Sequence, residues 1–240
     1  MTTLLYLTDS YLQTFDAKVT QVEADSRGIV LDRSAFYPGG GGQPCDYGSM
    51  TIGTTSYPVE RVKKRGDDSV HFLGGSEPIP SPGAAIHGQI AWERRYKLMR
   101  THSAMHVLCG VIFRDYGALV TGCDFEPLSG HMDFEFETLG AELVKAIEET
   151  VNQEIKSGRE VKIRTLPRLE AFKIPDLIRT KINLLPENIT RSARWKSLGW
   201  ISRRMEGPTS VTLRKSGISA SWIIRARAPS INESIYPSNE

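Results

Sequence analysis

The alternation of apolar and polar side chains divides this chain into a strand-rich first part and a helix-containing second part. Within residues 1–90, short β-branched segments such as A-K-V-T-Q-V-E-A and G-I-V-L-D-R are separated by the turn D-S-R-G, and loops rich in glycine and proline follow. This pattern predicts β structure as far as S-E-P-I-P-S-P-G, a segment typical of a hinge.

A different period begins at Ala91. Apolar side chains at Leu98, Met105, Leu108 and Ile112 recur at helical spacing, which predicts a long helix with a broad apolar face. We expect a second domain to start here.

The second domain continues with a strand, a helix and another strand. Met132, Phe134 and Phe136 alternate with acidic residues, as in a half-buried strand. Apolar residues at four-residue steps then predict a helix that ends near Gly158, and E-V-K-I-R-T returns to the strand pattern. The prediction is an α+β domain with helices packed on an antiparallel sheet.

Composition is that of an ordinary globular protein, with 40% hydrophobic and 24% charged residues. No stretch approaches the roughly 18 apolar residues of a membrane span, and the start of the chain lacks the basic region of a signal peptide. Cys45, Cys109 and Cys123 follow no disulfide spacing, which favours a reducing compartment. We expect a cytoplasmic protein without a membrane partner.

The net charge of +2 hides an uneven distribution. Residues 191–240 carry nine basic and three acidic side chains, a net charge of +6, which leaves −4 for residues 1–190. A basic tail is compatible with nucleic-acid binding, but the rest of the chain has no positive excess that would attract phosphates. Charge therefore gives no indication of a DNA partner.

Two histidines carry the first chemical signal. His102 and His106 are four residues apart in the predicted helix, so both imidazoles lie on one face and can reach one cation. No glutamate follows His102, which excludes the H-E-x-x-H arrangement of metalloproteases. Spacing alone leaves two interpretations open, half of a metal site or two histidines of the core or surface.

The second signal is L-D-R-S-A-F-Y-P-G-G-G-G-Q-P-C-D-Y-G, residues 31–48. Its four consecutive glycines leave backbone N–H groups uncovered and allow φ angles closed to other residues, so a substrate can approach the backbone closely. A plain flexible loop is the alternative. The motif lacks the Lys-Ser/Thr pair of a P-loop, which disfavours nucleotide binding.

Together, these motifs resemble those of a known family. The order and spacing of A-F-Y-P-G-G-G-G-Q-P-C-D-Y-G and R-R-Y-K-L-M-R-T-H-S-A-M-H-V-L are similar to the editing domain of alanyl-tRNA synthetases, and in particular to the free-standing AlaX editing proteins of the longer, glycine-motif type. The resemblance extends over residues 1–190. It implies a small N-terminal β-barrel over residues 1–90, followed by a synthetase-type α+β editing domain over residues 91–190.

The resemblance also implies an activity, the hydrolysis of mischarged Ser-tRNA(Ala), and in some members of Gly-tRNA(Ala), at a site that contains Zn²⁺. His102 and His106 would be metal ligands. Such a site needs an oriented water, donors for the developing oxyanion and a cation. The residues implied for catalysis are Gln43 and Ser34, and those implied for substrate binding are Gly39, Gly40, Gly41, Gly42, Asp46 and Arg100. For Arg100, capping a solvated helix face is an equal alternative.

The sequence departs from this family after residue 190. Family members complete the zinc site with a Cys- or Asp-Gly-Gly-Thr-His segment, but the other histidines here are His71, His87 and His131. Residues 191–240 hold three of the four tryptophans and ten serines, no aspartate, and no strand or helix period. This stretch is interpreted as a divergent basic tail.

Our hypothesis for the tail is a one-base frameshift near Thr190. Residues Arg203 to Val211 can be encoded CGG-CGG-ATG-GAG-GGA-CCC-ACG-TCG-GTA, and the same bases read one base earlier give Ala-Asp-Gly-Gly-Thr-His-Val-Gly. On this hypothesis the chain lacks two of the expected zinc ligands, which reduces metal affinity and catalysis.

Three alternatives to a deacylase remain open. One is a non-catalytic tRNA-binding module, and another is an unrelated metal hydrolase that uses His102, His106 and His131. A fragment of an alanyl-tRNA synthetase is the third, although the initial methionine and short leader fit a free-standing protein better. The sequence gives no indication of the oligomeric state.

Overall fold

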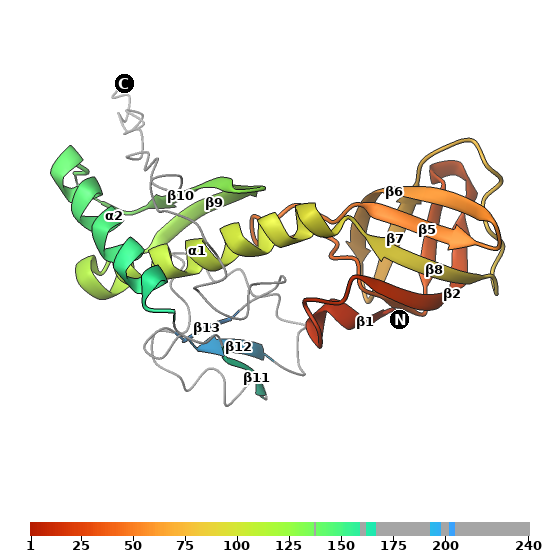
Figure 1. The fold of residues 1–240 in the computed structure, drawn as a ribbon, viewed down its shortest axis with the longest axis horizontal. Coiled ribbons are helices and arrows are strands. Elements are labelled where there is room, and N and C mark those ends of the chain that lie inside the picture. The colour runs from red at the N-terminus through yellow and green to blue at the C-terminus, as the bar shows by residue number, and fades with distance from the viewer. Residues whose placement is uncertain (137, 159–161, 167–192, 198–201, 205–240) are drawn as a thin grey trace, which may run out of the picture.

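The structure, a computed structural model, describes residues 1–136, 138–158, 162–166, 193–197 and 202–204 (Figure 1). A β-barrel occupies the N-terminal part, and one long helix leads from it into a second unit of helices and strands. The predicted fold class, α+β with an N-terminal barrel, is confirmed.

Six strands form the closed barrel. Their bounds are β2 (Thr14–Glu23), β3 (Gly28–Leu31), β5 (Gly48–Ile52), β6 (Thr55–Arg65), β7 (Asp68–Leu73) and β8 (Ala85–Ile90). The order around the barrel is β2-β3-β7-β6-β5-β8, with every neighbouring pair antiparallel. Outside the barrel, β1 (Thr3–Leu4) pairs in parallel with β4 (Arg33–Ser34), and two 3₁₀ turns span Leu5–Leu7 and Ala24–Ser26.

Alternating side chains fill the barrel interior. Phe15, Ala17 and Val19 point inward from β2, with exposed residues between them. Phe36, from the loop after β4, is fully buried and meets Phe15 edge to face at a centroid distance of 5.7 Å. The start of the glycine motif is therefore anchored in the barrel core.

The helix α1 (Trp92–Tyr116) begins directly after the barrel and runs into the second unit (Figure 1). Its 25 residues give a length of about 37 Å. Gly117, with φ of +69°, ends the helix and donates its N–H to the Phe113 carbonyl. Among the described residues, no helix combines the length and apolar character needed to cross a membrane.

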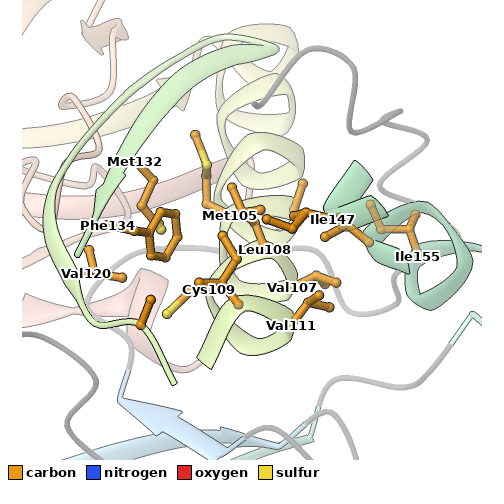
Figure 2. Packing of buried hydrophobic residues seen from close by; sticks show 14 of the residues in the cluster. Met105, Val107, Leu108, Cys109, Val111, Val120, Met132, Phe134, Ile147 and Ile155 are labelled. Carbon is orange, nitrogen blue, oxygen red and sulfur yellow. The ribbon is translucent and has the colours of Figure 1, made fainter. Parts of the chain in front are cut away.

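The second half of α1 forms the core of the second unit. The hairpin of β9 (Val120–Glu126) and β10 (Ser129–Phe134) packs on one side, and α2 (Ala141–Lys156) packs on another (Figure 2). Ile147, Val151 and Ile155 are the buried residues of α2, at the four-residue steps seen in the sequence. The predicted helices and strands of this unit are thus present.

The remaining described strands form a second, separate sheet. β11 (Lys162–Leu166), β12 (Ala193–Ser197) and β13 (Ser202–Arg204) pair antiparallel in chain order. Where the sequence suggested a single sheet, the described strands of this unit form two separate groups, β9–β10 and β11–β12–β13. β12 and β13 also lie in the tail, where the sequence showed no strand period. Strands this short carry almost no sequence pattern and depend on pairing with neighbouring strands for their formation. The rest of residues 191–240 lies outside the described residues.

Candidate active site

The two histidines lie on one stripe of α1, with His102 buried and His106 half-buried. Arg95, Met99, His102 and His106 follow one another at steps of three or four residues, so they share one face of the helix. The two imidazole rings stack with centroids 4.7 Å apart. His102 is 5% exposed, and its ring lies 5.3 Å from that of Phe125 on β9.

Gln43 connects the glycine motif to this stripe. Its side-chain oxygen Oε1 lies 2.6 Å from Nδ1 of His102, and both side chains are buried. Because an amide oxygen only accepts hydrogen bonds, the contact requires Nδ1 of His102 to carry the proton. The lone pair of His102 is then on Nε2, the arrangement that metal-binding histidines adopt when an oxygen acceptor orients them.

The glycine motif forms a tight turn rather than an open loop. Gly40 and Gln43 exchange two backbone hydrogen bonds of 3.0 Å, which makes Gly41 and Gly42 the central residues of a two-residue turn. Their φ angles, +55° and +82°, have the positive sign that a type I′ turn requires. The Tyr37 hydroxyl donates a hydrogen bond of 2.9 Å to the Gly40 carbonyl, which stabilises the turn.

This turn docks on β9 of the second unit. The N–H of Phe125 donates to the Gly42 carbonyl at 2.9 Å, and Cys123 Sγ lies 3.8 Å from the Gly41 carbonyl. A Cβ at Gly42 would lie 2.9 Å from the backbone oxygen of Cys123, closer than real contacts allow. Glycine at position 42 is therefore needed both for the turn and for the contact that brings Gln43 to His102.

A buried ion pair fixes the base of the motif to α1. Arg95 donates to both carboxylate oxygens of Asp46, and the Asp46 carboxylate also accepts the N–H of Tyr37 at 2.6 Å. The same guanidinium donates to the carbonyls of Ala35 and Ser10. Both side chains of the pair are at most 1% exposed. Asp46, which the resemblance implied for substrate binding, forms this buried ion pair with Arg95. Sequence reasoning missed Arg95, although it shares the helix face of His102, seven residues later.

Ser34 lies inside the barrel, away from solvent. Its Oγ is 2.8 Å from Nε2 of His71 and accepts the N–H of Phe36 at 3.1 Å. Both Ser34 and His71 are 0% exposed. Nδ1 of His71 lies 3.3 Å from the Ile29 carbonyl, and burial lowers the pKa of His71 from 6.5 to about 4, so the ring is neutral at pH 7. The structure thus joins Ser34 to His71, a partner that no sequence signal indicated, and not to the histidine pair.

The donor set for a metal is half complete. With Nδ1 protonated, Nε2 is the His102 atom suited to a metal by tautomer, and His106 follows one helical turn later, which suits two positions of a tetrahedral site. In the part of the chain that the structure describes, no three His, Cys, Asp or Glu side chains come together to hold a metal. His131, the third ligand in one alternative, is exposed on β10 opposite Asp124. The unrelated metal hydrolase therefore has no support among these residues.

The exposed side of the turn offers hydrogen-bond donors. Gly40 and Gly41 are exposed, and within the described residues the N–H groups of Gly41 and Gly42 meet no acceptor. Such N–H groups can receive a carbonyl oxygen or an oxyanion. Arg100 is half-buried on α1, two residues before His102. Hydrogen-bond donors and an imidazole pair therefore lie near one another where the glycine turn meets α1 and β9.

Comparisons with known proteins show which proteins this chain resembles. Residues 6–94 match the model of the class II (A) tRNA synthetases. The chain is 36% identical over 185 residues to an alanyl-tRNA editing protein AlaX-M of Saccharolobus solfataricus, a match that covers 75% of each chain. A second AlaX-M, from Methanosarcina mazei, is 34% identical over 79% of this chain and 78% of its own. An alanine–tRNA ligase of Ignicoccus hospitalis is 39% identical over 70% of this chain but only 18% of the ligase.

Proposed function

The chain belongs to the AlaX family of alanyl-tRNA editing proteins, and we propose that it hydrolyses the aminoacyl ester of tRNA(Ala) mischarged with serine or glycine. The observation that carries the proposal is the hydrogen bond between Gln43 and His102. It joins the two motifs of the resemblance, far apart in the sequence, into one site. The proposed location is the cytoplasm.

The proposed cofactor is Zn²⁺, held by His102 and His106. When bound, it would supply positive charge that orients the substrate amine or a water. The chain has no cysteine after Cys123 and no histidine after His131, so no ligand of these kinds comes from residues 132–240. We therefore propose weak zinc binding and an activity below that of a complete site.

The remaining work of the site is done by the chain's own polar groups. The N–H groups of Gly41 and Gly42 would stabilise the negative charge that develops on the carbonyl oxygen of the ester as water attacks the carbonyl carbon. Gln43 holds the His102 ring in one tautomer, and the Asp46–Arg95 pair keeps the motif against α1. Ester cleavage then releases the free amino acid and the terminal hydroxyl of the tRNA.

The incomplete ligand set favours one second candidate, a non-catalytic tRNA-binding module. It would keep the glycine motif and its contacts without a functional metal. The tRNA would still bind, and the ester would remain intact.

Deacylation of Ser-, Gly- and Ala-tRNA(Ala) by the purified chain separates these functions, with His102→Ala as the matched control. The proposal requires faster release of serine or glycine than of alanine, and loss of that release in the variant. Retained tRNA binding with hydrolysis no faster than the spontaneous rate would replace the deacylase with the binding module.

A further inference from the structure

Three aromatic side chains form a cluster where α1 leaves the barrel. Trp92 and Tyr96 stack with centroids 5.7 Å apart and ring planes at 24°. Tyr11, from the loop before β2, lies 5.7 Å from Trp92 and 6.4 Å from Tyr96. All three rings are partly exposed. This aromatic cluster is therefore partly accessible to solvent at the start of α1.

The cluster lies on the helix that carries the histidine pair. Trp92, Tyr96 and Arg100 are four residues apart in turn and share a face of α1 next to the face of His102 and His106. Along the helix axis, Tyr96 is about 9 Å from His102 and Trp92 is about 15 Å from it. A chain of stacked nucleotides, which rises about 3.4 Å per residue, bridges these distances with three to four nucleotides.

The helix segment that carries the cluster has an excess of basic residues. The first turns of α1 contain Arg94, Lys97 and Arg100 against one acid, Glu93, besides the neutralised Arg95. Arg94 lies 4.1 Å over the ring of Tyr47, which is 44% exposed. Aromatic rings interleaved with basic side chains are the combination that binds single-stranded nucleic acid, with bases on the rings and phosphates on the cations.

We propose that the aromatic cluster of Tyr11, Trp92 and Tyr96 stacks the unpaired bases at the 3′ end of the tRNA, and that Arg100 contacts their phosphates. The proposal rests on the proposed function, because it needs a tRNA whose terminal ester lies at the histidine pair. The buried Asp46–Arg95 pair already joins the motif to α1, so the cluster is not required for that link. Stacking tolerates any base, as suits a strand held by its position rather than by its sequence.

Binding of a fluorescein-labelled single-stranded RNA ending in C-C-A, followed by anisotropy at one fixed salt concentration, tests this. Trp92→Leu and Tyr96→Leu should each weaken binding by about 5- to 100-fold, because each removes a stacking ring. Tyr96→Phe keeps the ring and should bind within about twofold of the parent. Tyr116→Leu is the matched control, since Tyr116 is a 41% exposed aromatic at the far end of the same helix.

Thermal unfolding midpoints identify variants that have lost their fold. If Trp92→Leu does not fold, Trp92→Phe and Tyr96→Leu carry the test. Folded leucine variants that bind as tightly as the parent would overturn the inference, as would a parent that does not bind the RNA. Weakened binding together with no deacylation of Ser-tRNA(Ala) by the parent would support the cluster while rejecting the proposed function. Deacylation of Ser-tRNA(Ala) by the parent, together with leucine variants that bind the RNA as tightly as the parent, would support the proposed function and reject the role of the cluster.

Discussion

Gln43 and His102, 59 residues apart in the sequence, share a buried hydrogen bond of 2.6 Å. The contact joins a turn of the barrel domain to the helix of the second unit. It also selects the tautomer of His102 that leaves Nε2 unprotonated.

Removing the acceptor should loosen metal binding. Gln43→Ala frees the His102 ring to change tautomer and orientation, and we expect about 10- to 100-fold weaker zinc binding. Gln43→Glu restores an oxygen acceptor and should bind zinc at least as well as the parent. Competition with a chromogenic chelator measures the affinities. Equal affinities for the parent and Gln43→Ala would show that the contact does not orient a ligand.

Gly42→Ala should destabilise the protein more than a glycine-to-alanine change in a turn that packs against no other part of the chain. The new Cβ meets the Cys123 carbonyl oxygen at 2.9 Å, in addition to the cost of a φ of +82°. Gly53→Ala is the control, because Gly53 has a φ of +59° but no atom near its Cβ position. The positive φ alone costs about 1–2 kcal/mol, and Gly42→Ala should exceed that. Urea unfolding compares them, and equal losses would contradict the close contact.

Breaking the Asp46–Arg95 pair should cost about 3–5 kcal/mol of unfolding free energy, since it leaves one charge buried without its partner. Asp46→Leu is the test, and the double variant with Arg95→Met should recover much of the loss. Glu93→Ala breaks the exposed ion pair with Lys97 and should leave the unfolding free energy nearly unchanged. A double variant no more stable than Asp46→Leu would mean that the pair is not the dominant interaction.

His71 should make the barrel sensitive to acid. Its folded pKa of about 4 lies below the ordinary 6.5, so the unfolded chain binds the proton first as pH falls. The stabilisation that the neutral, buried His71 gives to the folded state is complete above pH 6.5 and is lost progressively as the pH falls to about 4. Between pH 7 and pH 5 the loss is about 2 kcal/mol. Unfolding free energies of the parent and His71→Gln at both pH values measure it, and identical pH dependence in the two proteins would refute the assignment.

The nucleotide sequence of the gene tests the frameshift hypothesis. We expect the codons for residues 203–211 to give Gly-Gly-Thr-His when read one base earlier. Codons that do not give this segment in the shifted frame would reject the hypothesis. Elemental analysis of the purified chain provides the protein-level test. It should find less than one zinc per chain, whereas one tightly held zinc would show that the site is complete.

Local patterns in the sequence were enough for much of the fold. Short β-branched runs predicted strands in the region of β2 and β3, and helical spacing predicted α1 and the buried face of α2. The histidine pair and the glycine turn were also visible, because both consist of residues close together in the chain. These features depend on backbone periodicity and on the φ angles that glycine permits, which neighbouring residues determine.

Only the tertiary structure decided which residues meet. Gln43 with His102, Asp46 with Arg95 and Ser34 with His71 are separated by 59, 49 and 37 residues. Each contact depends on barrel closure, on strand register and on the angle at which α1 leaves the barrel, and no local period encodes these. Ser34 shows the difference, since it belongs to the glycine-motif segment but its hydroxyl points to His71 inside the barrel. The sequence by itself determined the elements and the candidate chemistry, and long-range packing decided the partners of each polar group, because a buried polar atom must find a partner wherever the fold places one.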